Sequence, residues 1–107
     1  MSNKFKTTLK RPMLEALSSY IEMLIVKHPA QEDDDKLLYA NLLEVKLKAD
    51  QKLAAYKEVY SLTLCPAQAI AVRIMYVNYV IDSTTYLGNK LLQLSNQIHQ
   101  QFFNIKL

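Results

Sequence analysis

One glycine in 107 residues, Gly88, limits what this chain can fold into more than any other feature of its sequence. Average usage of about 7% would give roughly seven glycines. Tight turns need residues that tolerate positive φ, and glycine supplies most of them. β-sandwiches, small barrels, glycine-rich phosphate loops and dinucleotide-binding fingerprints are therefore disfavoured. The sequence predicts a few long helices instead.

The three prolines divide the chain into three predicted helices. Pro12 and Pro66 suit the first turn of a helix. His28-Pro29 ends one, because the residue before a proline is pushed out of the α region. The predicted helices cover residues 12–28, 34–62 and 66–104.

The last predicted helix keeps an apolar rhythm of four and three from Ile70 to Ile105 without losing phase. This favours one continuous helix, although residues 82–88 have weak helix propensity. A kink or break there, giving a four-helix bundle, stays open. Residues 1–10 lack an apolar period and are interpreted as a flexible basic arm. We expect one all-α domain over residues 1–107, an elongated antiparallel bundle of three long helices.

Composition and cysteine usage bear on the compartment. Half of the residues are hydrophobic and 21% are charged, which is enough apolar surface for a core. A single cysteine forms no intramolecular disulfide, so an oxidising compartment is not required. The most apolar stretch, residues 67–81, is too short for a membrane span and contains Arg73 and Asn78. No signal-peptide pattern opens the chain. We expect a cytoplasmic protein that does not span a membrane.

The third predicted helix carries apolar and tyrosine residues opposite its heptad stripe. With Ile74 and Val77 on the stripe that faces the core, the opposite side should be charged, and it is not. One reading is a central helix buried on all sides. The other is an interface, since tyrosine and methionine are enriched in interfaces. The predicted interface residues are Val72, Met75, Tyr76, Tyr79, Tyr86, Phe102 and Phe103. We therefore expect a non-enzymatic helical interaction module that forms a homodimer or binds a helical protein partner.

The alternative function is a nucleic-acid-associated accessory protein. Four basic residues precede the first acidic one: Lys4, Lys6, Lys10 and Arg11. Cations clustered in this way can contact a phosphate backbone. The net charge of +3 is too small to imply nucleic acid by itself.

No pattern in the sequence indicates catalysis, a metal or a cofactor. Cys65 stands at a predicted helix start, where thiols are more reactive, but no spacing pairs it with His28 or His99. A lone cysteine is usually a small buried hydrophobe. The acidic run from Glu32 to Asp35 lacks a calcium-loop pattern and suits a helix N-terminus. We expect no enzymatic activity, no catalytic residues, no bound metal and no cofactor.

Overall fold

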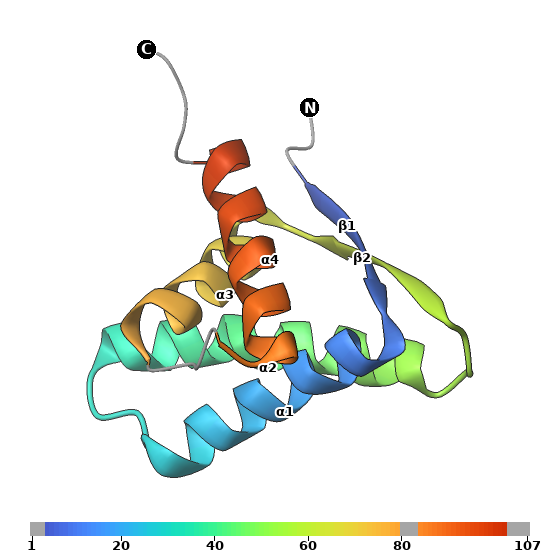
Figure 1. The fold of residues 1–107 in the computed structure, drawn as a ribbon. Coiled ribbons are helices and arrows are strands. Elements are labelled where there is room, and N and C mark those ends of the chain that lie inside the picture. The colour runs from blue at the N-terminus through green and yellow to red at the C-terminus, as the bar shows by residue number, and fades with distance from the viewer. Residues whose placement is uncertain (1–3, 80–83, 103–107) are drawn as a thin grey trace.

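Two strands and four helices make up the described part of the chain, residues 4–79 and 84–102 of this computed structural model (Figure 1). In chain order they are β1 (Phe5–Lys10), α1 (Arg11–Lys27), α2 (Asp33–Leu53), β2 (Val59–Leu64), α3 (Pro66–Asn78) and α4 (Tyr86–Phe102). The protein is mostly helical, as predicted. The prediction of an all-α bundle is wrong, because the two strands form an antiparallel sheet.

The predicted flexible arm at residues 1–10 is a β-strand from Phe5 onward. β1 pairs with β2 over its full length, with Phe5 opposite Leu64 and Lys10 opposite Val59. Phe5 and Leu9 are buried, while the alternate residues of β1 point to solvent. Only two large apolar residues mark this period of two, which is why the segment resembles an unstructured arm in the sequence.

The predicted helix over 34–62 ends at Leu53, and the strand β2 follows it. In β2, Tyr60, Leu62 and Leu64 are buried, and Val59 is exposed. A shortage of glycine disfavours strands that are joined by tight turns, and β1 and β2 are not joined in that way. Here two helices connect β1 to β2, so no hairpin is needed, and no described residue has positive φ.

The predicted helix over 66–104 is broken, as its four-helix alternative allowed. α3 ends at Asn78 and α4 begins at Tyr86; residues 80–83 lie outside the described part. Gly88 is buried in the first turn of α4, where its backbone N–H donates to Thr85 Oγ1 at 3.0 Å. This bond satisfies one of the free N–H groups at the start of a helix.

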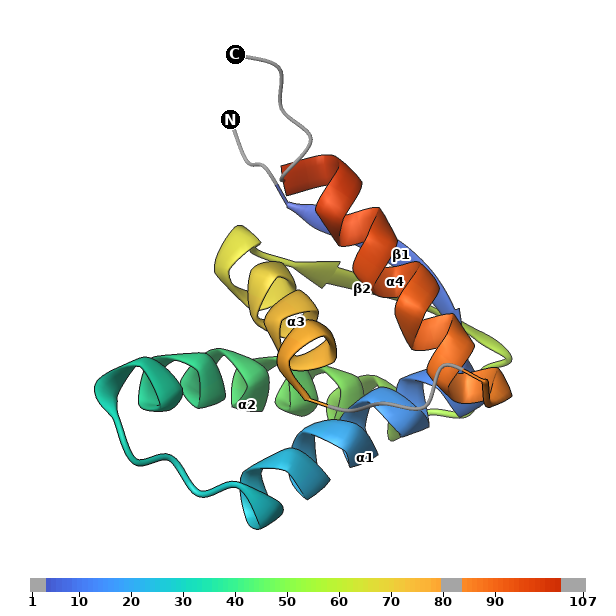
Figure 2. The ribbon, with the colours of Figure 1, turned by 60° about the vertical axis from the view of Figure 1, so that its left-hand side comes forward.

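The chain contains the same succession of elements twice, a strand followed by two helices. Pro12 lies in the first turn of α1 and Pro66 in that of α3, each directly after its strand. The halves interlock, because β1 pairs with β2, α2 packs against α3, and α1 packs against α4 (Figure 2). The described residues extend over 37 × 36 × 29 Å, so the elongated shape predicted from the sequence is wrong.

The core lies between the helices and one face of the sheet. Its fully buried side chains come from all four helices and from β2, and include Leu14, Leu17, Ile21, Leu42, Val45, Leu62, Leu64, Val72, Leu91 and Ile98. The other face of the sheet is left without a covering helix, as the exposure of its residues shows.

Candidate functional site

The uncovered face of the sheet brings together six side chains, which we call the ribbon face: Lys6, Thr8, Lys10, Val59, Ser61 and Thr63. The register places Lys6 opposite Thr63, Thr8 opposite Ser61, and Lys10 opposite Val59. Thr63 is half-buried and the other five are exposed. The face therefore offers two cations and three hydroxyls, with no carboxylate among its members.

The four predicted basic residues separate into two environments. Lys4, Lys6 and Lys10 are exposed along β1 and its start. Arg11 is instead held within the chain, where Nη1 donates to Tyr60 Oη at 2.6 Å and the guanidinium lies 5.1 Å from the ring centroid of Tyr56. Its Nε is 3.7 Å from a carboxylate oxygen of Glu15. Arg11 thus fixes the junction of β1 with the start of β2, and the three lysines remain available.

Three hydroxyl residues of the ribbon face are not among the candidates predicted from the sequence: Thr8, Ser61 and Thr63. Their signal is the period of two in residues 59–64, where buried and exposed residues alternate. The sequence predicts a helix over most of that segment, and a helix there does not place its hydroxyl residues beside the lysines. Only the pairing of β1 with β2 brings them to the same surface.

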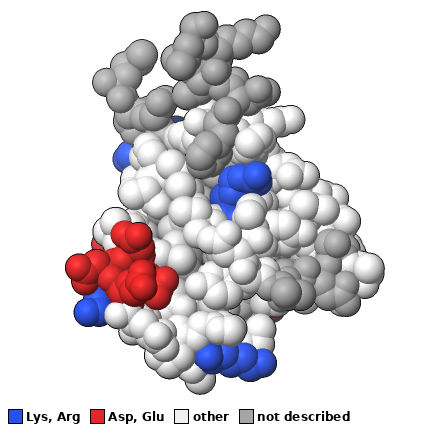
Figure 3. All heavy atoms as spheres, turned by 90° about the vertical axis from the view of Figure 1, so that its left-hand side faces the viewer, with Lys and Arg blue, Asp and Glu red and all other residues white. Residues whose placement is uncertain are grey.

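Acidic side chains gather away from the ribbon face. Glu32 and the three aspartates of Asp33–Asp35 lie at the start of α2, and Figure 3 shows acidic residues as one compact patch on that side of the molecule. Asp33 pairs with Lys36 of the same helix at 4.0 Å. The acidic start of α2 lies at the opposite end of the molecule from β1 and β2 in Figure 1. The four acidic residues at the start of α2 therefore lie away from the lysines of the ribbon face.

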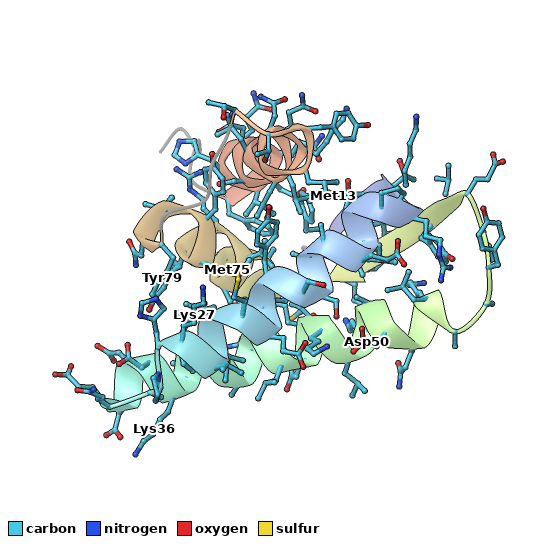
Figure 4. All side chains as sticks on the ribbon, turned by 60° about the horizontal axis from the view of Figure 1, so that its bottom comes forward. Met13, Lys27, Lys36, Asp50, Met75 and Tyr79 are labelled. Carbon is cyan, nitrogen blue, oxygen red and sulfur yellow. The ribbon has the colours of Figure 1, made fainter. Side chains whose placement is uncertain are left out.

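The predicted interface on the third helix does not form one surface. Val72 and Met75 are core residues, and Figure 4 shows Met75 between α3 and α1. Ile74 and Val77, assigned to the core, are 37% and 59% exposed. The heptad pattern predicts these buried and exposed faces wrongly, because it treats residues 66–104 as one helix with one continuous apolar stripe. In the structure, α3 is a separate 13-residue helix packed against α2 and α4.

The aromatic members of that predicted interface are dispersed. Tyr76, Tyr79 and Phe102 are half-buried, Tyr86 is 63% exposed, and Phe103 lies outside the described residues. Tyr79 packs its ring against His28, with the centroids 5.3 Å apart. Tyr76 and Tyr79 thus lie at the end of α3, whereas Tyr86 begins α4.

Tyr39, which lies beside His28 and Tyr79, has a pKa that is shifted by its surroundings. The hydroxyl of Tyr39 donates to the backbone carbonyl of His28. Burial, with a further contribution from Tyr79, raises the pKa of Tyr39 to about 12. The neutral phenol is favoured because only it can donate this hydrogen bond. Its role is to join the end of α1 to α2.

Two polar clusters also hold helices together. Ser18 Oγ of α1 donates to a carboxylate oxygen of Asp50 of α2 at 2.7 Å, and Lys46 Nζ lies 2.9 Å from both partners. Burial raises the pKa of Asp50, but the hydrogen bonds from Ser18 and Lys46 outweigh it and the pKa is lowered overall. We call this the Asp50 cluster.

The second cluster surrounds Gln68, a buried side chain of α3. Its Oε1 accepts from the backbone N–H of Cys65 at 3.1 Å and from Lys48 Nζ at 3.0 Å, and its Nε2 donates to Glu44 at 2.8 Å. The half-buried Cys65 therefore sits at the N-cap of α3 in a capping box. Its surroundings are those of a helix start.

The described residues contain no group of three or more His, Cys, Asp or Glu side chains placed to hold a metal ion. No helix among them is both long and apolar enough to cross a bilayer.

Comparisons with family models, curated proteins and solved structures found no match to this chain.

Proposed function

We propose that this protein binds double-stranded DNA with its ribbon face. The observation that carries the proposal is the juxtaposition of Lys6, Lys10 and three hydroxyl residues on the one sheet face that no helix covers. Lysines supply contacts to phosphates or to the acceptor edge of guanine, and Ser and Thr hydroxyls donate to or accept from either kind of group.

The shape of the site favours a duplex of B-form. The major groove of B-DNA admits a two-stranded β-ribbon, and proteins that read DNA with strands place them in a groove. The major groove of A-form RNA is deep and narrow, so side chains on a ribbon do not reach its bases. A ribbon of two six-residue strands therefore fits DNA better than double-stranded RNA.

The rest of the fold supports this use of the sheet. An isolated two-stranded ribbon is marginal in water. Here Phe5, Tyr60 and Leu62 are buried on its inner face, so the helices hold it in place. A preorganised ribbon loses little conformational freedom when it binds. The acidic start of α2 lies at the other end of the molecule, where it repels a bound phosphate backbone less.

Fluorescence anisotropy with a labelled duplex two helical turns long tests the proposal. We expect binding at about 50 mM salt that weakens as salt rises, because phosphate contacts release counterions. The double variant Lys6→Gln/Lys10→Gln should lose about tenfold in affinity for each phosphate contact removed at that salt concentration, with a correspondingly shallower salt slope.

The matched control is Lys27→Gln/Lys36→Gln. It changes the net charge equally but removes two exposed lysines from the α1–α2 end of the molecule (Figure 4). Equal losses in both double variants would show only a general charge effect. That result, or no binding by the unsubstituted protein at low salt, would refute the proposal. Deletion of the first eleven residues is not a suitable test, because it removes β1 and uncovers the core.

Exposed leucines on α2 favour a second candidate function, association with a second copy of this chain. Leu43 and Leu47 are 51% and 59% exposed, one helical turn apart. α2 begins with three aspartates and carries lysines in its second half. A second copy packed antiparallel along this face would place opposite charges beside each other. Sedimentation velocity at micromolar concentration should show a dimer that Leu43→Gln/Leu47→Gln converts to monomer; a monomeric unsubstituted protein would refute this candidate.

A further inference from the structure

A cavity of about 290 Å³ opens between β1 and α4, beside the ribbon face. Its apolar lining includes Leu9, Met13 and Leu94, which are buried side chains of the core. Figure 4 shows Met13 between the start of α1 and α4. Its volume is near the lower end of the range for small-molecule sites. This part of the cavity suits a small hydrocarbon or aromatic group.

The polar lining of the cavity is cationic and uncharged, with no carboxylate. Lys10 comes from β1 and Lys90 from α4. Lys90 Nζ lies 5.6 Å from the ring centroid of Tyr86, which also lines the cavity. Thr7 Oγ1 donates a hydrogen bond to Gln97 Oε1 at 3.3 Å, across the interface of β1 with α4. Because this hydrogen bond is long, both groups can also bind a ligand.

We infer that this cavity binds a small organic anion, a carboxylate attached to an apolar body, and that such a ligand competes with DNA. Leu9, Met13 and Leu94 contact the apolar body, while Lys10 and Lys90 attract the carboxylate. A cation is disfavoured by the two lysines. A nucleotide is disfavoured by the small volume and the apolar floor.

The competition follows from residues that the cavity shares with the ribbon face. Thr8, Lys10 and Val59 belong to both. A carboxylate beside Lys10 removes a cation from the surface proposed to contact phosphate. This second half of the inference rests on the proposed function, whereas ligand binding in the cavity does not.

The experiment uses 4-phenylbutyrate as the probe and 4-phenylbutyramide as its neutral counterpart. Both are titrated into protein with labelled methyl groups, and binding is followed by NMR. We expect the anion to shift the methyl signals of Met13 and Leu94, and the amide to bind more weakly. Lys90→Gln should weaken binding of the anion by about threefold to tenfold, and Lys36→Gln should leave it unchanged. Met23, which lines two other cavities, reports binding elsewhere.

Several outcomes overturn the site: no shift at Met13 or Leu94, equal binding of the amide and the anion, or shifts confined to Met23. In a second arm, the probe is added to the protein–DNA mixture, where we expect the apparent Kd for the duplex to rise. Probe binding without this rise overturns the competition. Absence of DNA binding before the probe is added refutes the proposed function, while methyl shifts that depend on the anion still support the cavity as a ligand site.

Discussion

Val72 and Val77 lie on the same helix, α3, in opposite environments, and replacing each by alanine tests which face of that helix is inside. Val72 is fully buried and Val77 is 59% exposed. The heptad pattern of the sequence instead predicts Val77 in the core and Val72 on the opposite face. Both substitutions delete the same two methyl groups and change the helix propensity equally, so each variant is the control for the other.

The expected magnitudes follow from burial. Two buried methyl groups contribute about 1.6 kcal/mol at about 0.8 kcal/mol each, and the cavity left behind raises the cost of Val72→Ala to about 2–3 kcal/mol. Val77→Ala should change the free energy of unfolding by about 0.5 kcal/mol or less. Proteins of this size are stable by only about 5–15 kcal/mol, so the first change is a large fraction of the total.

Urea denaturation followed by far-ultraviolet circular dichroism measures both variants. With a slope of about 1–3 kcal/mol per molar, the midpoint of Val72→Ala should fall by about 1 M or more, and that of Val77→Ala should barely move. A greater loss in Val77→Ala than in Val72→Ala would refute the assignment of faces, and with it the packing of α3 against α2 and α4.

Three further predictions test the polar contacts. The pKa of Asp50 is lowered in the folded state, so its contribution to stability is present above the ordinary value of 3.8 and is lost as the pH falls below it. Ser18→Ala should weaken this acid dependence in denaturation midpoints measured across pH. An unchanged pH profile would contradict the role given to the Asp50 cluster. Tyr39 should ionise only near pH 12, and stability should fall as the pH rises from 10.0 to about 12. A pH titration of Tyr39→Phe followed by phenolate absorbance should lack that late ionisation step. If the step persists in this variant, it belongs to another tyrosine. Gln68→Ala should cost about 1–2 kcal/mol by denaturation, because it removes the capping hydrogen bond from the Cys65 N–H and the hydrogen bond from the half-buried Lys48. The exposed Gln93→Ala should cost about 0.5 kcal/mol or less.

The helices could be predicted from the sequence because prolines mark where they begin and end. α1 begins at Arg11, one residue before Pro12, and α3 begins at Pro66. The strands could not, because their pairing joins residues that are 49 to 59 positions apart. Tyr56 and Val59 continue the apolar rhythm of α2 in the sequence, but both are exposed, and Val59 already belongs to β2. Local periodicity carries no information on a partner so distant.

Only part of the candidate site could be predicted from the sequence, for the same reason. Lys4, Lys6 and Lys10 form a basic cluster in any reading of residues 1–11. Their arrangement on one face depends on β1 being a strand, and the addition of Ser61 and Thr63 depends on the register with β2. A pairing between distant strands is a property of the tertiary fold, so no local pattern shows it.

The interlocked halves also bear on how the chain folds as it is synthesised. β1 leaves the ribosome well before β2, because the residue opposite Phe5 is Leu64. Until β2 emerges, the edge of β1 has no strand to pair with, and α1 and α2 lack the surfaces that α3 and α4 provide. A nascent chain halted before β2 therefore exposes an unpaired strand edge, the feature that promotes aggregation. The first half of the protein depends on the second to become a stable domain.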